Sequence, residues 1–236
     1  MLKKLGDRLF LVGVAHVLPK SAVEVGHIIA GERPDIVAVE LCPIRYLALT
    51  RGLKRPSMLE AMRAGGVKLS LFNSLLYLLQ KKFSHQTGMP AGEEMLVAIR
   101  HAQEIGARVE LIDRDIGITM QRLTDRMPWR ERLRLFAELL LGLLPFGKPV
   151  ELERLTDDQI VTYLLHELKQ TSPTAYQVLI MERDDYMASR VAMLLSASTG
   201  KVACVVGAGH VQGIYERLSR GISGSWRMRV EYRVGG

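Results

Sequence analysis

Two histidines stand in the same short motif near opposite ends of the chain. The segments GVAH (13–16) and GAGH (207–210) both consist of a glycine, two small residues and a histidine, and each follows a run of apolar residues. Glu40 stands in a comparable place, at the end of the apolar run DIVAVE (35–40). Two imidazoles and a carboxylate are a frequent ligand set for Zn²⁺, Mn²⁺ or Fe²⁺. An ion held in this way acidifies a bound water and polarises a carbonyl, so these residues would serve metal-assisted hydrolysis most directly.

Other interpretations of these residues stay open. A histidine at the end of a strand is more often a structural residue that is satisfied by backbone groups. Cys42 could act as an activated nucleophile beside a histidine, although cysteine is also a common small core residue. The charges at 113–115 and 182–185 could form solvated pairs on exposed faces. Alternatively, their arginines, Arg114 and Arg183, could hold a carboxylate or stabilise an oxyanion.

The apolar pattern predicts that these groups meet at one edge of a parallel sheet. The runs at 8–15 and 35–40 are short and rich in β-branched residues, and the sequence between them has helical spacing, which predicts a strand–helix–strand unit. Strands joined in this way are parallel and covered on both faces. Ligands bind beyond the carboxyl ends of such strands, where His16, Glu40 and His210 are expected. The glycine that opens each motif is expected to permit a sharp turn with a positive φ and a close approach by a ligand or backbone.

Further elements repeat this pattern. A helix is predicted at about 93–104, stopped by Gly106, and a strand follows at 108–113. Ser172 and Pro173 are typical of a helix start. No breaker follows them, so we expect one long helix before the strand that leads into the second motif.

Helical segments are inserted between these units. The stretches at about 53–83 and 120–170 are rich in leucine, arginine and glutamate, which predicts a helical layer. The stretch 226–234 alternates basic and apolar residues, as an edge strand protected by charge would. We therefore expect one α/β domain over residues 1–236, with a mixed, mainly parallel central sheet, helices on both faces and the inserted helical layer.

The composition is that of an ordered globular protein. Hydrophobic residues make up 48% and charged residues 24% of the 236 residues, which excludes a disordered chain. Two cysteines cannot form a disulfide framework and no signal segment opens the chain, so a cytoplasmic location is expected. The longest apolar runs, 69–79 and 135–147, are shorter than the about 20 residues of a spanning helix. They leave peripheral membrane contact or a homodimer interface open. The net charge of +7 comes largely from arginine clusters without interleaved aromatic residues, which disfavours a nucleic-acid partner.

Six segments in this order resemble the TraB family, from about residue 9 to 214. They are GVAH, VELCPIRY, GEEMLVAI, LIDRDIGITMQR, ERDDYMA and GAGHVQGI. The family includes the TraB and PrgY pheromone-shutdown proteins and is similar to the Tiki metalloproteases. The resemblance implies a fold related to the erythromycin esterase and ChaN-like group. Many microbial members continue into membrane-spanning helices, so membrane association is expected if a further segment follows Gly236.

The resemblance implies a metal-dependent hydrolase, most directly a peptidase that acts on peptides such as signalling peptides. By position it implies that His16, Glu40 and His210 hold one divalent cation, Mn²⁺, Co²⁺ or Zn²⁺. Glu94 would be a further ligand or the general base, and Arg183 would hold the substrate carbonyl or its terminal carboxylate. The family segments also match residues expected around the same cleft, of which Glu182 could instead relay a proton: Arg45, Asp113, Arg114, Arg122 and Glu182. A module that binds or sequesters a peptide without turnover, or a membrane-associated regulatory protein, remains the alternative.

Overall fold

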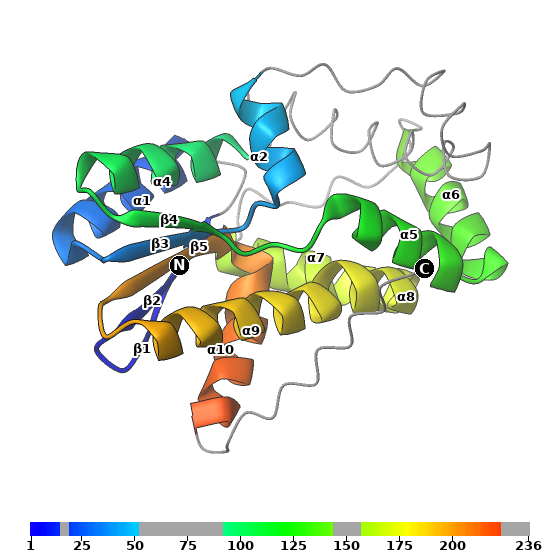
Figure 1. Ribbon diagram of the computed structural model, residues 1–236. Helices are drawn as coiled ribbons and strands as arrows, with labels where there is room; N and C mark the ends of the chain where they lie inside the picture. Colours follow the sequence, from blue (N-terminus) through cyan, green and yellow to red (C-terminus); the bar gives the residue numbers. More distant parts are fainter. Residues whose placement is uncertain (15–18, 52–91, 144–156, 223–236) are drawn as a thin grey trace, which may run out of the picture.

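A five-stranded sheet forms the centre of the computed structural model, which describes residues 1–14, 19–51, 92–143 and 157–222 (Figure 1). The first strand runs antiparallel to its neighbour, and the other four strands are parallel. From one edge to the other, the strands are β1 (Leu2–Leu5), β2 (Leu9–Val14), β5 (Val202–Gly207), β3 (Ile36–Val39) and β4 (Arg108–Leu111). The predicted α/β class with a mixed, mainly parallel sheet is confirmed.

The strands that precede the two motifs are direct neighbours. Val14 of β2 pairs with Gly207 of β5, and Val205 of β5 pairs with Val39 of β3 on the other side. The carboxyl ends of β2, β5 and β3 therefore lie side by side, as the sequence predicts. His16 itself lies outside the described residues.

Side chains alternate between two hydrophobic cores, one on each face of the sheet. Leu9 and Leu11 of β2 enter the first core, whereas Val12 and Val14 enter the second. The same alternation of period two occurs in β3 and β5. Strands covered on both faces need apolar residues at every position, which explains their continuous apolar runs.

Helices cover both faces of the sheet (Figure 1). On one face, α1 and α4 pack against each other and contribute to the second core, and on the other face α9 and α10 contribute to the first. The bounds of these helices are α1 (Pro19–Glu32), α4 (Glu93–Glu104), α9 (Glu182–Ala197) and α10 (Ala208–Ile222). The short helix α2 (Pro43–Thr50) follows β3. In the described part of the chain, none of the helices is both long and apolar enough to cross a bilayer.

A separate group of helices lies beyond the end of the sheet (Figure 1). Leu123, Met127, Ala175 and Val178 form its own small core. Its helices are α5 (Ile116–Arg126), α6 (Trp129–Leu143), α7 (Asp157–Thr171) and α8 (Pro173–Tyr176). The predicted helical layer at 120–170 is thus present over its described part, whereas residues 53–83 lie outside the described residues. The assignment of residues 1–236 to one domain stays a prediction.

The long helix predicted after Ser172 is present but contains one irregular turn. Ser172 caps its helix as expected, because its Oγ accepts a bond of 3.3 Å from the backbone N of Ala175. The helix is not uniform, however, since Gln177–Met181 forms a π-helical turn between α8 and α9. An antiparallel edge is supplied by β1, which was not predicted, and the stretch 226–234 lies outside the described residues.

The expected positive φ of the motif glycines is wrong. Among the described glycines, positive φ occurs at Gly6, Gly92 and Gly106, and not at Gly13 or Gly207. Gly13 instead permits close packing, because an added Cβ would lie 2.6 Å from Cγ2 of Val211. The first glycine of the motif thus serves the contact between β2 and α10.

Substitution of Gly13 by alanine is expected to lower the free energy of unfolding by about 1–3 kcal/mol, since the new methyl group overpacks this contact. Urea denaturation measures the change. Gly31→Ala in α1 is the matched control, because nothing lies within 4 Å of a Cβ there. That variant should hold or gain stability, by up to about 1 kcal/mol. Equal losses in both variants would contradict this role of Gly13.

Candidate active site

Glu40 and His210 meet at the carboxyl end of the sheet. Glu40 directly follows β3, and His210 lies in the first turn of α10, which follows β5. Oε2 of Glu40 accepts a hydrogen bond of 2.6 Å from the backbone N of Gly207. Its Oε1 lies 3.5 Å from Nε2 of His210. Both residues are buried, at 7% and 5% exposure. The structure thus brings together two of the three predicted metal ligands.

Asp184 fixes the orientation of the His210 ring. Oδ1 of Asp184 lies 2.6 Å from Nδ1, and Nη1 of Arg183 lies 3.1 Å from Nε2. A guanidinium only donates hydrogen bonds, so Nε2 must accept and Nδ1 must carry the proton. Burial raises the pKa of Asp184, and the bond from His210 only partly offsets this effect.

Arg183 lies between two buried carboxylates. It donates from Nε and Nη2 to Asp113, at 3.0 and 2.9 Å, and from Nη2 to Oε1 of Glu40. Burial would lower the pKa of Arg183, but Glu40 and Asp113 hold it above its ordinary value. For the Glu40 carboxylate, burial has the opposite effect and by itself would raise the pKa. The guanidinium of Arg183 and the bond from Gly207 lower that pKa below its usual range, and His210 adds to this effect when its ring is protonated.

Two pairs of consecutive residues interlock beside this site. Asp113 and Arg114 follow β4, and Glu182 and Arg183 open α9. Asp113 pairs with Arg183, whereas Arg114 pairs with Glu182 at 2.8 Å. This crossed pairing fastens the start of α9 to the carboxyl end of β4. The side chains of Asp113, Glu182 and Arg183 are only 3%, 11% and 14% exposed. The alternative interpretation, that these charges form solvated pairs on exposed faces, therefore does not hold for these three residues.

Glu182 is the centre of an arginine cluster. Arg122 donates to it from Nε at 2.7 Å and from Nη2 at 3.2 Å, and Arg126 donates from Nη1 at 2.6 Å. Arg114 completes the cluster. Burial would raise the pKa of Glu182, but the bonds from Arg122 and Arg114 lower it below its ordinary value. We call Arg114, Arg122 and Arg126 the arginine triad.

Three arginines donate hydrogen bonds to carbonyls of the π-helical turn. Arg114 donates to the carbonyl of Val178, Arg183 to that of Leu179 and Arg217 to that of Met181, each at 3.1 Å. These carbonyls lie within Gln177–Met181, where the wider turn changes the normal helical bonding. The turn immediately precedes Glu182 and Arg183, so it sets the direction in which both side chains leave the helix.

Arg45 and Glu94 lie on neighbouring elements. Nη1 of Arg45, on α2, is 3.7 Å from Oδ2 of Asp113. Glu94 is buried in the first turn of α4. A Cβ at the preceding Gly92 would lie 3.8 Å from Nη2 of Arg45, so this turn of α4 lies against α2. Arg45 therefore joins the Asp113 network directly, and Glu94 lies on the adjoining turn.

Sequence reasoning did not assign a role to Asp184 or Arg217. Nη1 of Arg217 lies 3.6 Å from Oδ2 of Asp184. His210, Gly213 and Arg217 share one face of α10 because of their helical spacing, and a Cβ at Gly213 would clash with Asp184. This spacing of histidine, glycine and arginine is the signal in the sequence that could have located the Asp184 pocket.

The thiol alternative finds little support. Cys42 and Cys204 are both free and completely buried. Cys42 precedes α2 as its N-cap residue. Burial raises the pKa of the Cys204 thiol. Because reactive cysteines are partly exposed thiolates, these two serve the core instead.

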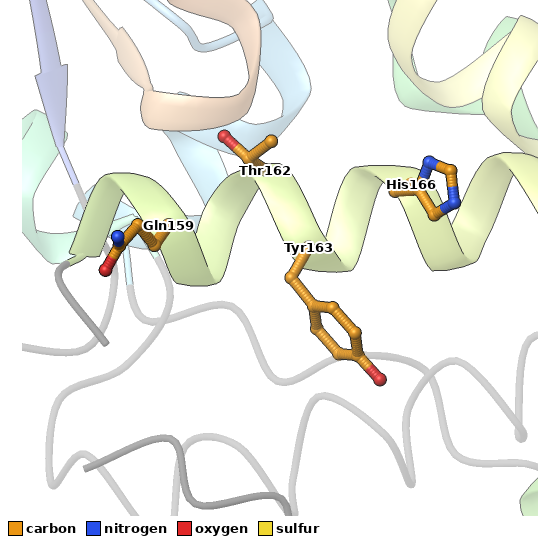
Figure 2. A pocket seen from close by; sticks show the side chains of 4 residues that line it. All are labelled: Gln159, Thr162, Tyr163 and His166. Carbon is orange, nitrogen blue, oxygen red and sulfur yellow. The ribbon is translucent and has the colours of Figure 1, made fainter. Parts of the chain in front are cut away.

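An open pocket of about 470 Å³ lies along α7 (Figure 2). Its described lining residues all come from this one helix: Gln159, Thr162, Tyr163 and His166. Leu165 of the same helix faces α10, because a Cβ at Gly209 would lie 3.5 Å from it. The helix that lines this pocket therefore packs against the turn that carries His210.

Comparison with known proteins agrees with the sequence motifs. A sequence model of the TraB/PrgY/gumN family matches residues 1–220. The chain belongs to the TraB/PrgY/gumN family. The predicted TraB resemblance is thereby confirmed, and the matched region contains every residue of the site described above.

The chain is also similar to proteins of Methanocaldococcus jannaschii and Homo sapiens. An uncharacterised protein of Methanocaldococcus jannaschii is 36% identical over 220 residues, which cover 90% of this chain and 53% of that protein. A TraB domain-containing protein of Homo sapiens is 28% identical over 239 residues, which cover 91% of this chain and 63% of the relative. The chain thus spans between 53% and 63% of the length of these relatives.

Proposed function

We propose that this TraB/PrgY/gumN family chain is a metal-dependent hydrolase that acts on peptide bonds. Glu40 and His210 would hold the divalent cation, and His16 is the expected third donor. The separation of 3.5 Å between Oε1 of Glu40 and Nε2 of His210 carries this proposal. Two donors that are each about 2.1 Å from a tetrahedral ion lie about 3.4 Å apart.

The environment of His210 fits the same role. A histidine that binds a metal through Nε2 normally donates from Nδ1 to a carboxylate or carbonyl, which fixes the tautomer. Asp184 accepts this bond at 2.6 Å. Within the described residues, no group of three or more His, Cys, Asp or Glu side chains could hold a metal. A third donor must therefore come from elsewhere, and the pairing of Val14 with Gly207 supports His16 as the candidate.

The remaining residues would bind and orient the substrate. A bound cation would acidify a water and polarise the peptide carbonyl. Arg183, held by Asp113, has a guanidinium beside both donors and would stabilise negative charge on the carbonyl oxygen. Three arginines hold Glu182 ionised, so it is poorly suited to accept a proton. This favours Glu94 as the proton relay.

One observation favours peptide binding without turnover. Arg183 already contacts both Nε2 of His210 and Oε1 of Glu40, so the two donors are satisfied by a protein cation. In a sequestering module these contacts would persist, and the arginines would matter more than the histidine. Peptide binding that survives a chelator and His210→Ala would then be expected.

Peptide cleavage with and without metal tests the proposed function. Purified protein is first stripped with a chelator and then given Mn²⁺, Co²⁺ or Zn²⁺ with a library of random decapeptides, and mass spectrometry detects the products. We expect cleavage to require one of these ions. Cleavage that persists in chelator, or binding of peptides without cleavage under any ion, would contradict the proposal.

A further inference from the structure

The arginine triad carries more positive charge than its carboxylate partner neutralises. Arg114, Arg122 and Arg126 all donate to Glu182. Three arginines and one carboxylate leave a formal charge of +2 in this cluster. Buried or partly buried positive charge of this kind favours a further anion.

Two arginines of the triad keep donors that face solvent. The side chains of Arg122 and Arg126 are 39% and 52% exposed, whereas Arg114 and Glu182 are only 10% and 11% exposed. Within the described residues, Arg122 donates from Nε and Nη2 and Arg126 from Nη1 alone. A guanidinium has five N–H groups, so both retain donors for another acceptor.

Glu182 holds these donors in place. It bonds Arg122 through two nitrogens and bonds Arg126 one helical turn further along α5. The two exposed guanidinium groups therefore converge from one helix face onto one point. An acceptor with two oxygens fits such a pair, because arginine binds carboxylates through parallel N–H bonds.

The triad also adjoins the candidate active site. Arg114 follows Asp113 in the chain, and Glu182 precedes Arg183. Asp113 and Arg183 belong to the network of Glu40 and His210. One extended ligand could therefore reach both the triad and the network of Glu40 and His210.

We infer that Arg122 and Arg126, backed by Arg114 and Glu182, bind a carboxylate of the substrate peptide. The assignment of this carboxylate to the substrate rests on the proposed function. The predicted substrate class is then a peptide with a free carboxylate close to the cleaved bond, either at its C-terminus or on an acidic side chain.

Calorimetry on metal-free protein tests this inference without any catalytic step. The probes are N-acetyl-alanyl-alanine, its neutral C-terminal amide, and N-acetyl-glutamyl-alaninamide, which carries its carboxylate on a side chain. Inorganic phosphate is the fourth probe. At least one carboxylate probe should bind at least about tenfold more tightly than the neutral amide, because hydrogen bonds to charged groups are stronger. The two carboxylate probes distinguish a terminal from a side-chain carboxylate.

Three variants locate the binding site. Arg122→Gln and Arg126→Gln should each remove the preference for the carboxylate probe. Arg130→Gln is the matched control, since it loses the same charge from an arginine that instead stacks on Trp129. Equal binding of charged and neutral probes, no binding of either carboxylate, binding of phosphate alone, or equal loss in Arg130→Gln would each overturn the inference.

The two proposals can fail separately. A carboxylate preference in a protein that cleaves no peptide would remove the hydrolase and leave the carboxylate site. Metal-dependent cleavage of acid and amide peptides at equal rates, together with equal binding, would remove the carboxylate site and leave the hydrolase.

Discussion

Glu40→Gln is expected to lower the rate of metal-dependent peptide cleavage at least about a hundredfold. Mutation of a residue that only orients a metal ligand already lowers metal affinity or activity about ten- to a hundredfold, and Glu40 is proposed to be a ligand itself. Glutamine has nearly the same shape and keeps an oxygen that can accept the bond from Gly207, and Asp113 still pairs with Arg183. It loses the negative charge that would hold a cation beside His210. The measurement is kcat/KM for a peptide identified in the cleavage screen.

A second glutamate provides the control for this loss. Glu110 lies on β4, opposite Ala38 of β3, and pairs with Arg108 at the surface. Glu110→Gln is the same chemical change on the neighbouring strand, and kcat/KM should stay within about twofold, as expected when a surface pair is lost. If the kcat/KM of Glu40→Gln equals that of Glu110→Gln, then Glu40 holds no cation during catalysis.

Arg183→Met is expected to lower the free energy of unfolding at pH 7 by about 3–5 kcal/mol, the usual cost when a buried ion pair loses one partner. Glu40 and Asp113 are carboxylates that, when ionised, can only accept hydrogen bonds, and both now accept from Arg183. In the variant they would stay buried without this donor and its charge. Methionine retains much of the side-chain volume, so the loss reports on charge more than on a cavity. Urea denaturation provides the free energy.

The loss should shrink as the pH falls. In the parent, the lowered pKa of Glu40 contributes stability that is complete above the ordinary carboxyl value of 4.5 and fades below it. Without Arg183, one of the groups that lower this pKa is gone, so Glu40 takes up a proton at higher pH. Protonation removes the buried charge from the variant, so the difference in free energy of unfolding between parent and variant should narrow as the pH falls from about 7 to about 4.

Arg190→Met separates this effect from the general loss of an arginine. Arg190 lies on the same helix, two turns further on, and its Nη2 is 3.9 Å from Oε2 of Glu110, which is a long separation for an ion pair. Its side chain is 33% exposed, so the variant should lose less than about 1 kcal/mol and show no such pH dependence. Similar losses for both variants, or a difference between parent and Arg183→Met that does not change with pH, would contradict the account of Arg183.

The sequence predicts most of the sheet because burial on both faces leaves a clear pattern. The runs that became β2, β3 and β5 are continuous and apolar, and a glycine or helix signal ends each of them. The order of the strands is harder to predict, since nothing local shows that β5 lies between β2 and β3. The edge strand β1 has the sequence LKKL, which is only four residues long and does not alternate between apolar and polar residues, so it leaves no distinctive strand pattern.

The candidate site is predictable where it depends on strand ends. Glu40 follows β3 and His210 follows β5, and the prediction that they share one ligand requires their strand ends to lie close together. In the structure β3 and β5 are paired, and the two side chains are 3.5 Å apart. Asp184 and Arg217 were missed because their roles depend on how α9 packs against α10. The π-helical turn at Gln177–Met181 was missed because the local sequence contains no helix breaker, and two of the arginines that bond its carbonyls, Arg114 and Arg217, are distant in the sequence.

Calorimetric titration of chelated protein with Mn²⁺, Co²⁺ and Zn²⁺ tests most directly whether Glu40 and His210 hold a cation. One ion should bind the parent with a stoichiometry near one, as expected for a single site. His210→Ala should abolish this binding, and Asp184→Asn should weaken it about ten- to a hundredfold, because the His210 tautomer is then no longer fixed. Equal metal affinity in the parent and His210→Ala, or no binding of any of the three ions to the parent, would contradict the metal site.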